Sequence, residues 1–270
     1  MSNTTGTNNT GIGADVLSAN TTGSYNTGVG TKTLSTNDTG FDNVAVGYHA
    51  LFSNVNGFSN TAVGVEALYS NSGFFGRYNT AIGRGSLYSN VNGLSNVAIG
   101  YHSLYDNNGI SNVGVGVQSL FNNTTGDANV AIGSGALEYN LTGSSNVSIG
   151  AGSSSLNIGG SNNVIIGTSA DVGAPNLTNA IAIGANAIVN TSNSMVLGDG
   201  SINVGIGNSN PTSTLHIEGF YGYNQLRLVT SYTPTGSTDV NGSVGDTAWD
   251  GAFIYIKTTA GWKRAGLSTF

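Results

Sequence analysis

The sequence predicts an all-β fold, a parallel β-solenoid with coils of about 17 residues. Three observations support this prediction: a motif returning at nearly constant spacing, an abundance of Gly and Asn, and a scarcity of charge. Gly supplies 42 of the 270 residues and charged residues only 7%, against roughly 25% in an average soluble domain. Because 38% of the residues are hydrophobic, a core remains possible, and this composition favours many short strands joined by tight turns.

The recurring motif is N-x-[small]-[V/I]-G, as in NVAVG ending at Gly47 and NVAIG ending at Gly100. Most copies are spaced like Gly30 and Gly47, about 17 residues apart, and the irregular spacings coincide with the segments SGFFGRY and DNNGIS. Such a Gly-rich unit is too short for a helix pair, so each copy predicts one coil with two short strands and two turns. The copies end at Gly13, Gly30, Gly47, Gly64, Gly83, Gly100, Gly116, Gly133, Gly150, Gly167 and Gly184, with a weaker one at Gly198.

Alternation along the strand assigns each position of the motif to a face. The fourth position is Val or Ile in nearly every copy, so we expect Val46, Val63, Ile82 and Ile99 to form one interior file. The small third position then faces outward, where it permits close approach of another chain. A second interior layer is expected from the Leu that follows each motif, namely Leu17, Leu34, Leu51, Leu68, Leu87, Leu104, Leu120 and Leu137.

Turns are expected where an Asn precedes a Gly by three residues, as from Asn37 to Gly40 and from Asn54 to Gly57. Twelve coils stacked about 4.8 Å apart would give a rod on the order of 55 Å long. So thin a coil has little interior, which favours association of three chains around one axis over a monomeric solenoid with a surface Ala row.

The coils resemble two related groups of proteins. NAIAIGANAIVNTSNSMVLGDGS, from Asn179 to Ser201, resembles the head repeats of trimeric autotransporter adhesins. Units such as NVAIGYHSLYDNNG resemble repeats of phage tail fibres, and NVGIGNSNPTSTLHIEG, from Asn203 to Gly219, resembles a segment that closes such repeat regions. The resemblance covers roughly residues 8–219 and implies left-handed β-rolls bundled as a homotrimer.

Composition divides the chain into a repeat shaft or head (1–202), a transition segment (203–219) and a small C-terminal β domain (220–270). The ending AFIYIKTTAGWKRAGL predicts a β-hairpin with a turn before Trp262. We expect this domain to be a tip that registers the three chains, with a receptor-binding tip as the alternative. The candidate binding residues of the tip are Trp249, Tyr255, Trp262, Lys263 and Arg264.

A second candidate binding surface is an aromatic ladder in the coils. The residue after the repeated Leu is aromatic in five consecutive units, and equivalent positions stack in a solenoid, so the rings should form a column. Such a column either stacks on sugar rings or stabilises the fold, and the structural role is the favoured interpretation. The ladder residues are Phe52, Tyr69, Tyr88, Tyr105 and Phe121.

Other classes of function find little support. There is no basic stripe for nucleic acid, no apolar run for membrane insertion, no Cys for disulfides, and no visible signal peptide. His49 and His102 occupy equivalent positions and are expected at the surface. The acidic residues lie at non-equivalent positions, and no catalytic triad, phosphate loop or metal cluster is present, so we expect no catalysis and no cofactor.

The expected function is that of a structural fibre protein of a phage tail or a related contractile injection particle, in the virion or on an extracellular particle. Its expected partners are its own copies, other tail or baseplate proteins, and a host-surface glycan or protein receptor. The alternatives are the head of a bacterial surface adhesin, displayed on the cell, and a polysaccharide depolymerase tailspike. An ice-binding solenoid is disfavoured, since no regular Thr-x-Thr row occurs.

Overall fold

The computed structural model describes residues 2–73, 75–218, 233–237, 239–241, 244, 246–249 and 253–266. Every regular element in these ranges is a β-strand and none is a helix, which confirms the predicted all-β class. The chain forms two compact units, Met1–Val204 and Gly205–Phe270.

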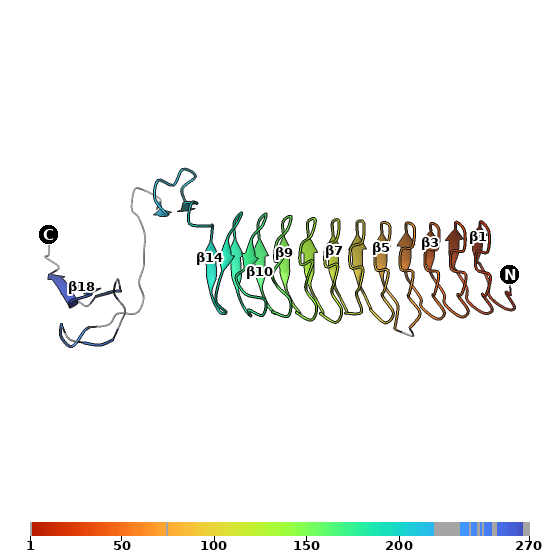
Figure 1. The fold of residues 1–270 in the computed structure, drawn as a ribbon, viewed down its shortest axis with the longest axis horizontal. Coiled ribbons are helices and arrows are strands. Elements are labelled where there is room, and N and C mark those ends of the chain that lie inside the picture. The colour runs from red at the N-terminus through yellow and green to blue at the C-terminus, as the bar shows by residue number, and fades with distance from the viewer. Residues whose placement is uncertain are drawn as a thin grey trace. The chain divides into compact units, whose positions relative to one another are not determined.

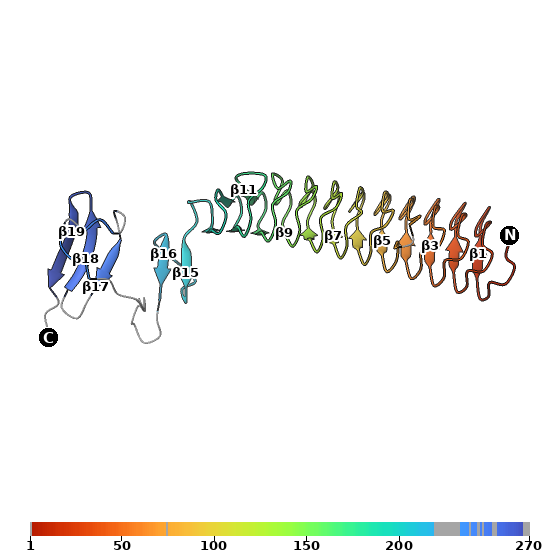
Figure 2. The same ribbon diagram turned by 90° about the horizontal axis from the view of Figure 1, so that it is seen from below.

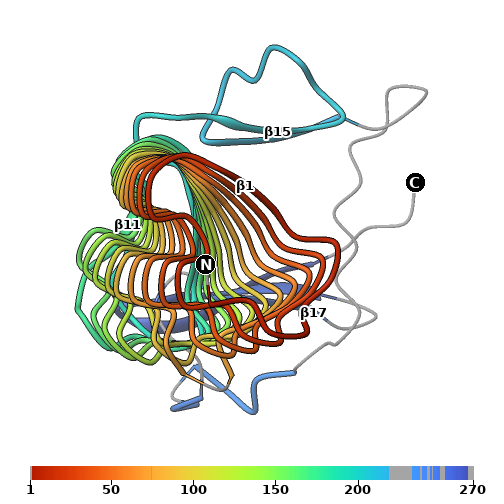
Figure 3. The same cartoon turned by 90° about the vertical axis from the view of Figure 1, so that its right-hand side faces the viewer.

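The first unit is a parallel β-solenoid. Each coil contributes one three-residue strand to a 12-stranded parallel sheet whose strands follow chain order (Figure 1). Viewed from the end, the coils lie one over the next (Figure 3). The strands are β1 (Thr10–Ile12), β2 (Thr27–Val29), β3 (Val44–Val46), β4 (Thr61–Val63), β5 (Thr80–Ile82), β6 (Val97–Ile99), β7 (Val113–Val115), β8 (Val130–Ile132), β9 (Val147–Ile149), β10 (Val164–Ile166), β12 (Ile181–Ile183) and β14 (Met195–Leu197).

Pairing of the strands confirms the repeat read from the sequence. Val29 of β2 pairs with Val46 of β3, and Val46 pairs in turn with Val63 of β4. The longer step between β4 and β5 and the shorter step between β6 and β7 leave this register intact. The extra and missing residues therefore lie in the turns, where they are absorbed without shifting any side chain to the other face.

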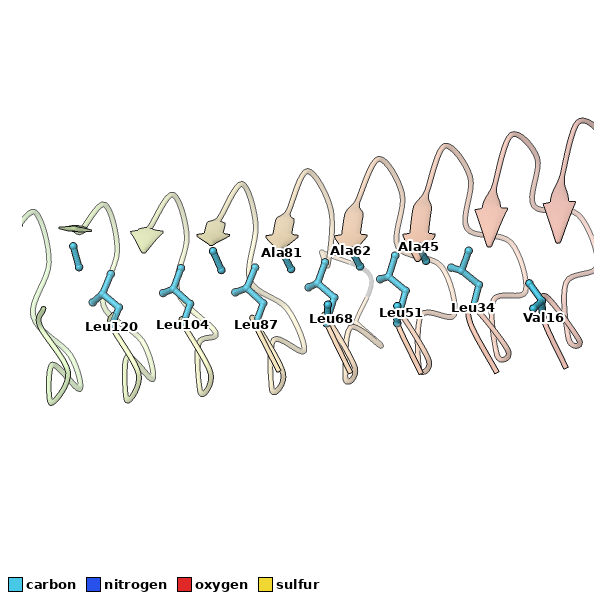
Figure 4. Close-up of a cluster of buried hydrophobic side chains, with 14 of the residues drawn as sticks. Val16, Leu34, Ala45, Leu51, Ala62, Leu68, Ala81, Leu87, Leu104 and Leu120 are labelled. Atoms are coloured by element: carbon cyan, nitrogen blue, oxygen red, sulfur yellow. The ribbon is translucent and has the colours of Figure 1, made fainter. Parts of the chain in front are cut away.

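The prediction of which face points inward is wrong. Val46 and its equivalents do form one file, but that file lies outside: Val46 is 37% exposed, whereas the neighbouring Ala45 is completely buried. The reason is that the repeated Leu side chains, such as Leu51, fill the interior of the coil (Figure 4). They project from the segment opposite the strand, here called the second leg of the coil. A methyl group added at Gly28 would already lie 2.6 Å from Cγ1 of Val16. Only Ala, Gly or Ser therefore fits at most of the inward strand positions.

A second strand was expected in each coil, but in the described part of the solenoid it occurs in only two coils, as β11 (Asp171–Val172) and β13 (Ile188–Val189). Elsewhere this leg takes left-handed backbone conformations at alternate residues, with φ of 58° at His49 and 49° at Leu51. Its amides still bond to neighbouring coils: the His49 N–H donates to the Thr31 carbonyl at 3.1 Å, and that of Leu51 to Ala67 at 2.9 Å. This side of the coil is thus hydrogen-bonded to both neighbouring coils without having strand geometry.

Two files of buried Asn close the turns. In the first, the Asn54 Nδ2 donates to the Gly57 carbonyl at 2.9 Å and to Asn37 Oδ1 at 2.7 Å, which confirms the predicted Asn-to-Gly turn. In the second, the Asn43 Nδ2 donates to the Gly57 carbonyl at 2.8 Å and the Asn43 Oδ1 accepts the Asn60 N–H at 3.1 Å. The Asn side chains thus pair with backbone groups of the turns and with the Asn residues of neighbouring coils, so few of the buried polar groups are left without a hydrogen bond.

The second unit contains two small sheets. β15 (Val204–Ile206) and β16 (Leu215–Ile217) form one, and His216 Nε2 of β16 lies 3.2 Å from Asn208 Nδ2. β17 (Thr247–Trp249), β18 (Phe253–Thr258) and β19 (Gly261–Gly266) form an antiparallel sheet (Figure 2). The β18–β19 pair confirms the predicted hairpin.

Candidate functional site

The predicted aromatic ladder is present as a column of parallel rings. Ring centroids of Tyr69 and Tyr88 lie 4.9 Å apart with planes at 4°, and Tyr88 and Tyr105 repeat the same values. Phe52 and Phe121 end the column at 5.1 Å from Tyr69 and Tyr105. Because each inner ring is covered on both faces by its neighbours, only ring edges are available to a ligand. This geometry suits a stabilising role better than sugar stacking.

Two histidines pack beside this ladder. His49 stacks on Tyr48 at 3.8 Å and tilts against Phe52, and His102 does the same with Tyr101 and Tyr105. Both are partly buried rather than open to solvent as expected. Burial lowers the pKa of His49 and His102, helped by the positive charges of Lys32 and Arg84 respectively, which favours neutral imidazoles. Burial likewise raises the pKa of the Tyr88 and Tyr105 hydroxyls.

The outward face of the 12-stranded sheet is a large uncharged surface. One of its two files is entirely Val, Ile or Leu, and the other holds Thr, Val, Ile and Met. Exposure is 37% at Val63, 40% at Ile82 and 39% at Ile99. At roughly 100 Å² for a fully exposed Val or Ile side chain, the two files together present several hundred Å² of apolar surface. This area is at least as large as the roughly 300–600 Å² of the largest patch on a typical monomer.

A second aromatic group, which the sequence analysis did not single out, lies on the turn side of the first coils. Phe41 and Phe58 follow the turn glycines of adjacent coils and stack at 4.7 Å with planes at 5°. Tyr78 meets Phe58 edge-on at 5.4 Å, and the Arg77 guanidinium lies 5.3 Å from the Phe58 centroid. An aromatic residue directly after the turn glycine in two successive coils was the signal that could have revealed it.

Two hollows lie on the turns of the solenoid. One, of about 390 Å³, is lined by Thr22, Ser24, Tyr25, Thr39, Phe41 and Asp42. The other, of about 870 Å³, is mainly apolar and is lined by residues that include Tyr139, Leu141, Leu156, Ile158 and Pro175. The first combines exposed rings with a carboxylate and hydroxyl groups, whereas the second offers chiefly hydrophobic contact.

The candidate tip residues separate into core and surface. Tyr255 and Trp262 are each only 6% exposed and pack with Ala248, and the Trp262 indole N–H donates to the Asn241 carbonyl at 3.0 Å. Lys263 and Arg264 are exposed, and the Arg264 guanidinium lies 4.2 Å from the Phe253 ring centroid.

Four of the five candidate tip residues come together at one hollow. This hollow, of about 360 Å³, is lined by Pro234, Thr235, Gly236, Ser237, Tyr255, Trp262, Lys263 and Arg264. Trp249 is partly buried on β17 and does not line it. Binding at the tip therefore stays a prediction. The groups that would contact a ligand there are the ring edges of Tyr255 and Trp262 and the charged ends of Lys263 and Arg264.

Within the described ranges, no three His, Cys, Asp or Glu side chains gather closely enough to hold a metal ion. The one buried carboxylate of the solenoid, Asp171, accepts hydrogen bonds from the Ser155 hydroxyl at 2.6 Å and the Val172 N–H at 2.8 Å, a structural role. Nor does the described part of the chain contain a helix long and apolar enough to span a bilayer.

Comparison with protein-family models, with curated proteins and with solved structures finds no match to this chain.

Proposed function

We propose that this chain is the structural subunit of a fibre, in which three copies associate through the outward Val and Ile face of the solenoid. The observation that carries the proposal is that face itself: it runs along all twelve strands without a charged residue. A soluble rod that exposed it would aggregate or bind another surface. A second copy of the same face is the partner that matches it over its full length, strand for strand.

The rest of the solenoid supports a mechanical role. Its coils are tied by backbone hydrogen bonds on both legs and by two files of buried Asn. Such a stack resists bending because every coil contacts its neighbours over their whole cross-section. The rod would carry its receptor contacts, in the turns or in the C-terminal β domain, at a fixed distance from the particle. Three copies of a weak contact then act together and raise avidity.

The coils are proposed to be left-handed β-rolls, as in the fibres and adhesin heads that they resemble. The particle is a phage tail or a contractile injection system, to whose other tail or baseplate proteins the fibre is attached. The chain has no catalytic role in this proposal. A host-surface glycan or protein is the receptor, and display on a bacterial cell is the alternative location.

Light scattering of the purified protein tests the assembly. Wild type should have three times the mass of one chain. The double variant Ile82→Lys, Ile99→Lys should have the mass of a single chain, because two cations per chain cannot be buried in an apolar interface. Val91→Lys is the matched control, since the coils before and after carry the polar Ser72 and Asn108 at the equivalent position. A monomeric wild type, or a trimeric double variant, would contradict the proposal.

Labelled electron microscopy of the native particle then tests the location. Density for this chain in a tail fibre supports the proposed function, and density on a bacterial surface favours the adhesin. Release of oligosaccharides from host capsule by the purified protein would instead identify a depolymerase.

A further inference from the structure

The aromatic group on the turns ends in a ring with one uncovered face. Phe58 has Phe41 on one side, at 4.7 Å, and the Arg77 guanidinium 5.3 Å from its ring centroid. Among the described residues, Phe41 stacks only on Phe58, because the equivalent residue of the preceding coil is Ser24, whose carbonyl accepts the Asp42 N–H at 3.1 Å. A Ser side chain is too small to cover a phenyl ring, so the outer face of Phe41 is open.

That open face forms one wall of the 390 Å³ hollow described above, here called the Tyr25–Phe41 hollow. The hollow is shallow and largely open to solvent, so it can hold one ring of a larger surface molecule but does not enclose a small ligand. Tyr25 is 60% exposed and Phe41 is 41% exposed. The left-handed backbone at Tyr25, with φ of 59°, is shared by the equivalent residue of every coil from Asp42 to Asn193 and is therefore part of the fold.

The polar groups of the hollow are unequally engaged. The Ser24 hydroxyl accepts the Thr7 N–H at 3.0 Å, and the Thr39 hydroxyl donates to Asn56 Oδ1 at 2.7 Å. The Asp42 carboxylate and the Thr22 hydroxyl make no hydrogen bond to any residue in the described ranges. A carboxylate accepts hydrogen bonds only, so Asp42 is suited to a ligand that carries hydroxyl donors.

These features select a class of ligand. A flat aromatic face packs against a ligand that has an apolar face of its own, and the carboxylate and hydroxyl beside it bond to the polar rim of that ligand. A pyranose ring has both. None of the six lining residues is a cation, and Asp42 repels anions, so sialylated or sulfated sugars are disfavoured. With a single free ring face, the hollow does not surround a quaternary ammonium ion as an aromatic cage does.

We infer that the Tyr25–Phe41 hollow binds one neutral sugar residue of a surface glycan, stacked on Phe41 and hydrogen-bonded to Asp42. The inference deepens the proposed attachment function and rests on it for biological meaning, but the binding itself does not depend on the number of chains. It also places recognition at the second and third coils instead of at the aromatic ladder, whose inner rings have both faces covered.

An oligosaccharide array with neutral, sialylated and sulfated members tests the inference, followed by saturation-transfer NMR titration of the best neutral ligand. Phe41→Ser should weaken binding about tenfold through loss of the ring face, and Asp42→Asn about threefold or more through loss of a charged acceptor. Phe41→Ser should fold normally, since Ser24, Ser144 and Ser161 occupy the same position in other coils. Circular dichroism checks this.

Tyr88→Leu, in the aromatic ladder, is the control and should bind like wild type. The inference is overturned if Phe41→Ser binds as well as wild type, if Tyr88→Leu removes binding, if no neutral oligosaccharide binds, or if choline binds more tightly than the sugars do. Light scattering on the same samples separates the two claims. A trimer that binds no neutral sugar contradicts this inference alone, and a monomer that binds one contradicts only the proposed assembly.

Discussion

The glycine that ends each strand is constrained both by conformation and by space. Gly100 has φ of 136°, a conformation that side chains rarely allow, and a Cβ there would lie 2.3 Å from the Gly116 carbonyl oxygen of the next coil. The same pair of constraints recurs at the equivalent glycine of most coils. The glycine of the motif is therefore required because the backbones of successive coils touch at this point.

Gly100→Ala should destabilise the protein by on the order of 3 kcal/mol or more, since the strained φ and the backbone clash add together. Gly152→Ala is the matched control: its φ of 63° is also left-handed, but a Cβ there meets nothing within 4 Å. It should cost only about 1–2 kcal/mol. Urea unfolding at equal protein concentration measures both, and equal losses would show that contact between coils is not the cause.

Single residues also show where sequence reasoning failed. The alternation in N-V-A-V-G placed Ala45 and Val46 on opposite faces, as the structure has them, but alternation cannot say which face is inside. Val is the more apolar residue, so it was assigned to the core. The decisive information lay in Leu51 on the opposite side of the coil, whose volume fills the narrow interior and leaves room for only a small residue at Ala45. That is a property of the cross-section of the coil.

At the scale of the elements, the turns are held by hydrogen bonds of Asn side chains, and the positions of these Asn residues can be read from the sequence. Coil lengths and the Asn-to-Gly turns follow from spacing alone, because identical positions must stack in a solenoid. The left-handed backbone at Leu51 could not be predicted, since residues with branched side chains rarely adopt it. It is stable here because the flanking amides bond to both neighbouring coils.

The Asn files make a quantitative prediction. Asn43 is fully buried, donates to the Gly57 carbonyl and accepts the Asn60 N–H. Asn43→Ala therefore leaves the Asn60 N–H buried and unpaired, whereas the Gly57 carbonyl keeps its hydrogen bond from Asn54. We expect a loss of about 2–3 kcal/mol. Asn92→Ala, at an exposed Asn in the turn of a later coil, should change stability by about 0.5 kcal/mol or less. Similar urea midpoints for the two variants would contradict a stabilising role for the file.

The candidate site was predictable only in part. The aromatic ladder follows from five successive aromatic residues at one position, and its rings stack as expected. Whether a ring offers its face or its edge depends on what occupies the adjacent coil. The open face of Phe41 arises because Ser24 precedes it in the stack, a relation between residues about 17 apart that becomes visible only once the coils are aligned.

For the solenoid as a whole, stability should be a sum over coils and their contacts, so that length is adjustable in whole coils. Deleting residues 131–147 removes one coil and joins Val130 to Ser148, which keeps every later side chain on its present face, because Ala131 and Ser148 pair in register. We expect this variant to fold, to retain the oligomeric state of wild type, and to melt within about 5 °C of it.

Deleting residues 131–138 is the control, because it removes about half a coil. The strand of one coil would then be followed by the turn of another, and the Leu and Asn files would be interrupted. Circular dichroism and thermal melting of both variants decide the matter. If the whole-coil deletion unfolds as readily as the partial one, the coils are not equivalent units, and stability depends on a particular segment of the chain rather than on the stacking of interchangeable turns.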